Sequence, residues 1–163
     1  MKHEAITLRK ASAGDLAAIN NVIDAAIMTW NLPARVKRLS LSSYQYAEHD
    51  LDSLELMVTE NSQQQITGVV AWEHADPKDV PVGKNALLLH GIYVDPQYQH
   101  QGIGSLLLAT AEKDARDRNY DGILVKAQSS AVEFFLKQGM KPLPVKNEKR
   151  DYAHRYWKPI EKR

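Results

Sequence analysis

The residues with the clearest chemical potential lie between an apolar run and an amphipathic segment, at positions 94–104. Gly102 and Gly104 allow the backbone to approach a ligand without a Cβ in the way. The helical pattern that starts directly after Gly102 would present amide N–H groups and the positive end of its dipole. Together these features predict a site for a phosphate or pyrophosphate group.

A glycine-rich turn of this kind has three competing interpretations. A dinucleotide-binding fingerprint requires a third small residue where this chain has Leu107. A nucleoside-triphosphate loop requires Gly-Lys-Ser/Thr, whereas Ile103-Gly104-Ser105 contains no lysine. In the third interpretation the first turn of a helix simply needs glycine, and the loop binds nothing.

Apolar periodicity predicts the elements that position this loop. The expected strands are residues 6–9, 54–58, 66–72, 86–94 and 123–127, with two more around 142–146 and 153–157. The expected helices are residues 15–27, 103–115 and 131–138, with a further helix starting at 40–43 after the interruption at Pro33. Either Ser12 or Asp15 could cap the first helix. The pattern is that of an α/β chain whose strands cluster before and after a central helix.

The loop and its surroundings resemble the GNAT acetyltransferase superfamily. Gln99-His100-Gln101-Gly102-Ile103-Gly104 matches the family pattern Gln/Arg-x-x-Gly-x-Gly/Ala, and residues 92–96 resemble the family's fourth strand and its exit. Residues 131–140 are similar to its last helix, Ala-x-x-Phe-Tyr-x-Lys-x-Gly-Phe. The resemblance implies one domain over residues 1–163, an α/β (α+β) fold with a mixed central sheet of about six to seven strands and about four helices. It also implies that this sheet is splayed between strands four and five.

The resemblance further implies that acetyl-CoA is the co-substrate and occupies that gap. The loop and Ser105 would surround its pyrophosphate through backbone amides, and the strand before the loop would pair with the pantetheine arm like an added strand. The family often has Asn near Ser129–Ser130, so this chain departs from the pattern there. The implied cofactor-binding residues are Ile92, Tyr93, Val94, Gln99, His100, Gln101, Gly102, Ile103, Gly104, Ser105, Ser129, Ser130 and Phe134.

Acetyl transfer to an amine requires a proton acceptor, because an amine is mostly ammonium near neutral pH. His90, four residues before Val94 on the apolar strand, is the candidate catalytic base, and a core histidine is the structural alternative. Glu73 and His74 are other candidates. An amide of the fourth strand could stabilise the oxyanion.

The usual acid of the family is a tyrosine, and this chain has Phe135 at that position. Tyr93, Tyr98 or Tyr152 could substitute, water could protonate the thiolate, or the protein could be an inefficient acetyltransferase. Since a CoA thiolate leaves without full protonation, we favour water. Phe135 also keeps open a second hypothesis, a non-catalytic CoA-binding or regulatory module.

The acceptor is expected to be a small-molecule amine or a peptide. Trp30, Trp72 and His74 are the predicted acceptor-binding residues, and core packing is the alternative for each aromatic ring. The formal net charge of +1 argues against nucleic acid or an anionic membrane as a partner. The chain has no cysteine, and its six histidines show no metal-ligand spacing, so no metal is expected. We expect a cytoplasmic protein. The sequence leaves the oligomeric state open, with a homodimer as one alternative because similar proteins are often dimers.

Overall fold

The computed structural model describes residues 5–127, 131–144 and 155–161. Their strands form a mixed seven-stranded sheet in the order β1-β2-β3-β4-β5-β7-β6, which confirms the predicted fold class. The strands are β1 (Thr7–Lys10), β2 (Glu55–Glu60), β3 (Ile66–His74), β4 (Ala86–Val94), β5 (Gly122–Lys126), β6 (Lys141–Pro142) and β7 (Arg155–Pro159). The α-helices are α1 (Leu16–Ile27), α2 (Ala34–Tyr44), α3 (Asp50–Ser53), α4 (Ile103–Asp117) and α5 (Val132–Lys137).

The chain divides into two compact units, and the division passes through β3 and β4. The first unit comprises Met1–Ala71 and Gly91–Leu108, and the second comprises Trp72–His90 and Ala109–Arg163.

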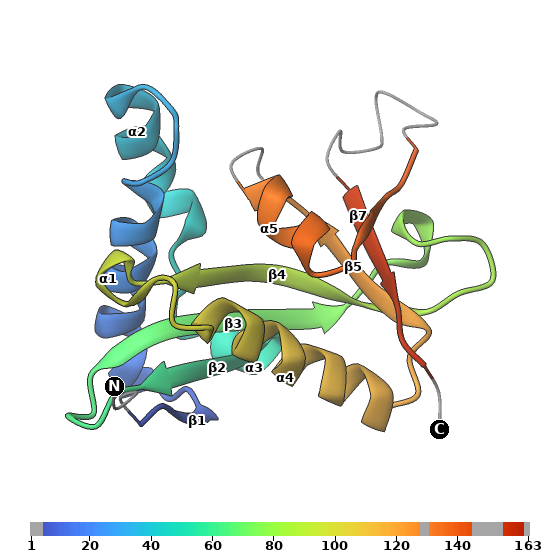
Figure 1. The fold of residues 1–163 in the computed structure, drawn as a ribbon, viewed down its shortest axis with the longest axis horizontal. Coiled ribbons are helices and arrows are strands. Elements are labelled where there is room, and N and C mark those ends of the chain that lie inside the picture. Colours follow the sequence, from blue (N-terminus) through green and yellow to red (C-terminus); the bar gives the residue numbers. More distant parts are fainter. Residues whose placement is uncertain (1–4, 128–130, 145–154, 162–163) are drawn as a thin grey trace. The chain divides into compact units, whose positions relative to one another are not determined.

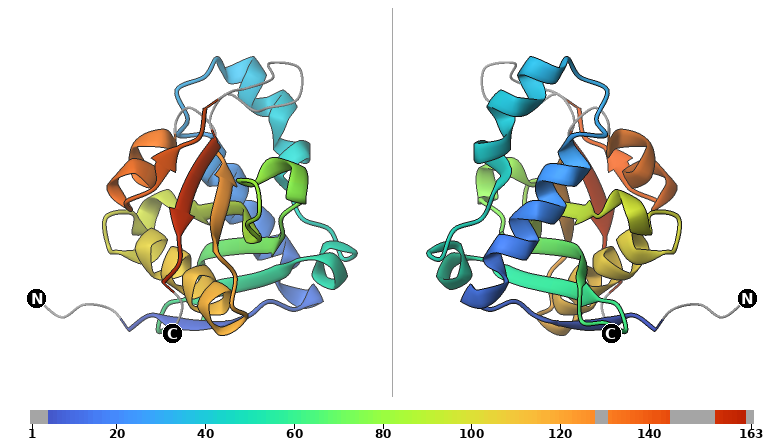
Figure 2. Two further views of the ribbon diagram at one scale, coloured as in Figure 1. Left: turned by 90° about the vertical axis from the view of Figure 1, so that its right-hand side faces the viewer. Right: turned by 90° about the vertical axis from the view of Figure 1, so that its left-hand side faces the viewer.

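In the first unit, α1 lies across one face of β2 and β3 (Figures 1 and 2). The buried face of α1 packs on inward-facing strand residues in a single apolar cluster. Its helical members are Ile19, Val22, Ile23, Ala26 and Ile27, and its strand members are Leu56, Val58, Val69, Ala71 and Tyr93. The three- and four-residue spacing that predicted this helix is therefore the spacing of its buried face.

Arg9 joins three elements at the start of the first unit. Its two terminal nitrogens donate to the Asp15 carboxylate at 2.7 and 2.8 Å, and its Nε donates to Glu60 Oε1 at 2.6 Å. These hydrogen bonds hold the pKa of Asp15 well below its usual value. The arrangement ties β1 to the beginning of α1 and to the end of β2.

The helix after Pro33 was predicted at the wrong place. Instead of starting at residues 40–43, α2 begins at Ala34, and residues 40–43 lie near its C-terminal end. Pro33 directly precedes the first helical residue. A proline at the start of a helix costs little, because the N–H that it lacks would have no intrahelical partner there.

In the second unit, β5 lies between β4 and β7 (Figure 2). Its pairing with β4 is parallel and runs from Ala86↔Gly122 to Leu89↔Val125. Its pairing with β7 is antiparallel from Gly122↔Pro159 to Lys126↔Arg155. The last two predicted strands fall partly on residues 145–154, outside the described residues, and their described parts are β6 and β7. No described helix is long and apolar enough to cross a membrane.

A glycine in β3 sets how closely α4 approaches the first unit's strands. A Cβ at Gly68 would lie 2.8 Å from Ile103 Cγ2, 2.9 Å from Thr59 Oγ1 and 3.0 Å from Leu107 Cδ1. The neighbouring Val69 points to the α1 cluster, since successive strand residues face opposite sides. Gly68 therefore lets the first turns of α4 rest directly on the strand.

We predict that Gly68→Ala lowers the free energy of unfolding by about 1–3 kcal/mol, the cost of overpacking a filled interior. Chemical denaturation measures this change. Gly14→Ala is the matched control, because a Cβ at Gly14 meets nothing within 4 Å, and it should change stability by less than about 0.5 kcal/mol. Equal effects of the two substitutions would contradict the proposed close packing of α4.

Candidate functional site

The predicted loop connects the end of β4 to the start of α4 within the first unit (Figure 1). Asp95 begins it: its N–H donates to Thr67 O at 2.9 Å, and its carboxylate accepts from Gln97 N at 2.9 Å. A short 3-10 turn, η3 (Pro96–Tyr98), follows. The loop is thus anchored to β3 before its glycines are reached.

The Tyr98 side chain provides a second anchor. Asn61 Nδ2 donates to the Tyr98 hydroxyl at 3.0 Å, and that hydroxyl lies 3.4 Å from Gln65 Oε1. Asn61 itself is buried and also accepts from the backbone N–H groups of Gln63 and Gln65 at 3.0 and 2.9 Å, which organises the turn between β2 and β3. Tyr98 therefore positions the loop, and we do not retain it as a candidate acid.

Two residues of the loop adopt left-handed backbone conformations. His100 has φ of 65° and Gly102 has φ of 79°. The first intrahelical hydrogen bond of α4 runs from Leu106 N to Gly102 O at 3.0 Å, so the N–H groups of Ile103 and Gly104 precede the helical ladder. A Cβ at Gly102 would meet nothing within 4 Å, and no acidic residue lies in the first turn of α4.

The predicted loop residues lie at the surface as an anion site requires. Ile103 is the exception, because it is buried and fastens the helix to Gly68. Gly104 is half-buried, and the exposed members are Gln99, His100, Gln101, Gly102 and Ser105. The loop can therefore offer backbone donors and the positive end of α4 to an anion without moving its anchored ends.

The strand before the loop contains an extra residue. At one end Asp95 N donates to Thr67 O, and at the other Ala75 N donates to Ala86 O, both at 2.9 Å. Between these bonds β3 advances eight residues and β4 advances nine. Because residues in a regular antiparallel pair advance together, β4 contains a β-bulge, a feature common beside active sites.

The parallel pairing of β4 with β5 also ends early, at Leu89. The rest of β4, through Ile92 and Val94, continues beyond that register. Ile92 and Val94 are half-buried, whereas Tyr93 is buried in the α1 cluster. The two residues predicted to pair with pantetheine thus belong to a stretch of β4 outside the β5 ladder.

The structural role of Gly91 in β4 was not predicted from the sequence. A Cβ there would lie 2.6 Å from Tyr93 Cε2 and 3.0 Å from the Tyr93 hydroxyl oxygen. The Tyr93 ring therefore folds back along the strand over Gly91. An isolated glycine inside an apolar strand is a sequence signal for a bulge or a close approach, and β4 shows both.

The predicted acceptor residues have different surroundings. Trp30 is half-buried against the α1 cluster, with its ring edge-on to Tyr44 at a centroid distance of 5.3 Å. Trp72 is buried, and its indole N–H donates to Asp114 Oδ2 at 2.7 Å. His74 is exposed, with Nδ1 3.1 Å from the Tyr120 hydroxyl. Trp72 is therefore a core residue, whereas Trp30 and His74 remain candidates for binding the acceptor.

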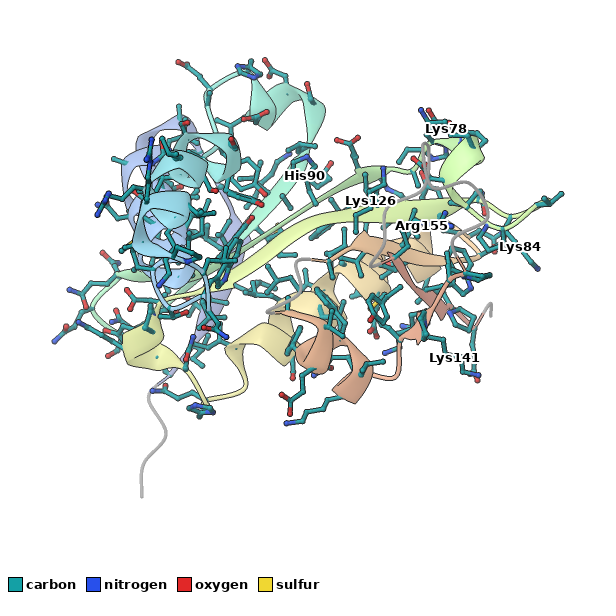
Figure 3. All side chains as sticks on the ribbon, turned by 90° about the horizontal axis from the view of Figure 1, so that it is seen from above. Lys78, Lys84, His90, Lys126, Lys141 and Arg155 are labelled. Carbon is teal, nitrogen blue, oxygen red and sulfur yellow. The ribbon has the colours of Figure 1, made fainter. Side chains whose placement is uncertain are left out.

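His90, the predicted base, is exposed on β4. Figure 3 shows it on the side of the second unit's strands that faces away from α5, the side on which Lys126 also lies.

In α5, Phe134 is half-buried and Phe135 is buried, with their rings edge-on at a centroid distance of 5.2 Å. Ser129, Ser130 and Tyr152 lie outside the described residues. Within the described residues, no group of three or more acidic, histidine or cysteine side chains is arranged to hold a metal.

The model of the acetyltransferase (GNAT) family matches residues 24–140, which include β4, the loop, α4 and α5. The chain belongs to the GNAT acetyltransferase family. A curated relative, N-acetyltransferase 8F1 of Mus musculus, is 36% identical over 80 residues, which are 47% of this chain and 35% of that protein. The match thus spans about a third of the relative's length.

Solved GNAT structures share the fold. A GNAT family acetyltransferase from Brucella melitensis, solved with acetyl-CoA, has a TM-score of 0.65 and 18% identity over 98% of this chain and 90% of its own. The PaiA N-acetyltransferase of Thermoplasma acidophilum, solved with coenzyme A, has a TM-score of 0.70 and 17% identity over 96% of this chain and 99% of its own. At these identities the likeness establishes the architecture.

The left-handed loop positions give opposite predictions for two substitutions. Gly102→Ala should lower the free energy of unfolding by about 1 kcal/mol, because a Cβ is disfavoured at positive φ. His100→Gly should leave it unchanged or raise it by up to about 1 kcal/mol, because it removes the same penalty. Chemical denaturation of both variants tests this pair, and destabilisation by His100→Gly together with no effect of Gly102→Ala would contradict the loop conformation.

Proposed function

We propose that this GNAT domain transfers an acetyl group from acetyl-CoA to a primary amine by direct attack in a ternary complex. The observation that carries the proposal is the continuous path from the bulged strand β4, through a loop with two left-handed residues, into α4. That path combines strand-edge backbone groups with a helix N-terminus, as a ligand with an extended arm and a pyrophosphate requires.

The residues present fit the pyrophosphate end of acetyl-CoA. The amide N–H groups of Ile103 and Gly104 would bind it, and the exposed His100 and Ser105 flank them. Open space beside Gly102 leaves room for the phosphate oxygens. Because α4 has no acid in its first turn, no carboxylate competes with the ligand for the positive end of the helix.

The pantetheine arm would pair with the backbone of Ile92 and Val94, beyond the end of the β5 ladder. The pantetheine arm would thus take the place of a neighbouring strand, and it would pair with backbone groups that in a regular sheet would pair with that strand. An amide released from regular pairing by the bulge would donate to the acetyl oxygen as negative charge develops on it. Acetyl-CoA itself supplies the activated thioester carbonyl.

His90 is the proposed proton acceptor for the amine. It is exposed and comes immediately before Gly91 in β4. An imidazole there would remove a proton from the amine as the C–N bond forms. Phe135 cannot donate a proton to the leaving thiolate, so that thiolate would be protonated by water after it leaves. Trp30 and His74 are the proposed acceptor-side residues.

The second candidate is a CoA-binding module of the same fold without catalysis. Buried Phe135, in place of the usual tyrosine, is the observation that favours it. Amine-dependent release of CoA distinguishes the two, because only the enzyme produces it.

The binding prediction compares two glycines with the same backbone conformation. Gly102 and Gly83 both have φ of 79°, and a Cβ at either meets nothing within 4 Å. Gly102→Glu should weaken acetyl-CoA binding by about 100-fold, because its carboxylate would face the pyrophosphate. Gly83→Glu carries the same charge and strain and should bind like the wild type. Isothermal titration calorimetry measures both affinities.

Loss of binding in both variants would contradict the placement of the pyrophosphate, and no binding by the wild type would contradict the proposed function. In a panel of primary amines, the wild type should release CoA with at least one amine. His90→Ala should lower that kcat by about 100-fold or more, the usual contribution of a general base. Binding without turnover of any amine would favour the non-catalytic module.

A further inference from the structure

The Tyr93 hydroxyl occupies an unusual position on β4. Its ring folds back over Gly91, so the oxygen lies 3.0 Å from the point where a Gly91 Cβ would be. Along the strand, the hydroxyl therefore lies beside Gly91, two residues before Tyr93. That stretch of β4 continues past the β5 ladder and belongs to the bulged strand.

This hydroxyl has no hydrogen-bond partner among the residues that the structure describes. Tyr93 is only 8% exposed, yet its oxygen is not among the buried polar atoms that are sealed without a partner. Buried tyrosines usually hydrogen-bond through their hydroxyl, because an unsatisfied buried group costs free energy. The oxygen is thus accessible to a partner that residues 5–127, 131–144 and 155–161 do not provide.

The surroundings keep this phenol neutral. Burial raises the pKa of Tyr93 well above its usual value, and the nearby Tyr44 raises it further. Tyr93 belongs to the same apolar cluster as Tyr46, against which Trp30 and Tyr44 pack. A neutral phenol in this setting donates a hydrogen bond and does not give up its proton to a thiolate, whose conjugate thiol is the stronger acid.

The chain order indicates which ligand atom reaches this hydroxyl. If the proposed function holds, the pyrophosphate lies at residues 99–105 and the pantetheine arm runs back along β4 past Val94 and Ile92. Its sulfur end then lies toward Gly91, where the Tyr93 hydroxyl is held. We infer that the Tyr93 hydroxyl donates a hydrogen bond to the sulfur of CoA and stabilises the departing thiolate.

In this role Tyr93 provides the hydroxyl group that Phe135 lacks, and it does so without transferring its proton. The amine nitrogen forms the C–N bond with the acetyl carbon, and the C–S bond breaks with its electron pair moving to sulfur. The Tyr93 O–H stabilises that charge as a hydrogen-bond donor and retains its proton. The nitrogen loses its proton to the base, and the thiolate takes one from water.

The test measures binding and needs no knowledge of the acceptor. CoA and desulfo-CoA, which lacks the sulfur atom, are titrated into wild-type protein and Tyr93→Phe at pH 9, where a fraction of the thiol is ionised and a hydrogen-bond donor at the sulfur favours that form. The wild type should bind CoA at least about tenfold more tightly than desulfo-CoA, the effect of a hydrogen bond to a charged group. Tyr93→Phe keeps the ring over Gly91 and should bind both ligands with the same affinity within about twofold.

Two further variants separate the hydroxyl from general packing. Gly91→Ala retains the hydroxyl but should displace it, because the new Cβ would lie 2.6 Å from Tyr93 Cε2, so the preference for CoA should fall there as well. Tyr156→Phe removes the hydroxyl of another buried tyrosine, on β7 and 6% exposed, and should keep the wild-type preference. Circular dichroism confirms that each variant is folded.

A Tyr93→Phe protein that still prefers CoA over desulfo-CoA as strongly as the wild type would overturn the inference. So would a wild type with no preference, or a loss of preference in Tyr156→Phe. If no variant and no wild-type protein binds either ligand, the proposed CoA site itself fails, which is a separate result from equal binding of both ligands.

Discussion

The first N–H groups of a helix can bind an anion only if the residues before the helix leave them without hydrogen-bond partners. The candidate site depends on how the chain passes from β4 into α4. The chain leaves β4 at Asp95, passes through His100 and Gly102 in left-handed conformations, and begins α4 at Ile103. Ile103 is fixed against Gly68, while Asp95 is fixed to Thr67. The ends of the loop are therefore rigid and its middle is exposed.

The same strand that delivers the loop also departs from regular pairing. The extra residue in β4 interrupts its regular pairing with β3, and the pairing of β4 with β5 ends at Leu89. Gly91 then allows the Tyr93 ring to cover that part of the strand. Backbone donors, a phenol and a helix N-terminus thus follow one another within a short length of chain, so the groups proposed to bind acetyl-CoA are concentrated in β4 and its exit.

Much of the layout could be predicted from local patterns. The bounds of β4 and of α1 followed from apolar runs and helical spacing, and the loop followed from its glycines. The predicted start of α2 was wrong, because Pro33 does not interrupt a helix there but directly precedes one. The bulge, the Gly68 contact and the Tyr93–Gly91 overlap depend on residues far apart or on side-chain direction, which local periodicity does not encode. The surroundings of Trp72 likewise required the position of Asp114.

Hydrogen–deuterium exchange of the backbone amides, with and without acetyl-CoA, measures whether the ligand protects the end of β4 and the loop before α4. We expect slower exchange at residues 92–94 and 99–105 on binding, because those amides would hold pantetheine and pyrophosphate. The turn of Asn61 to Gln65, already hydrogen-bonded within the protein, should change little. Acetyl-CoA binding that leaves residues 99–105 unprotected would show that the pyrophosphate does not bind at this loop.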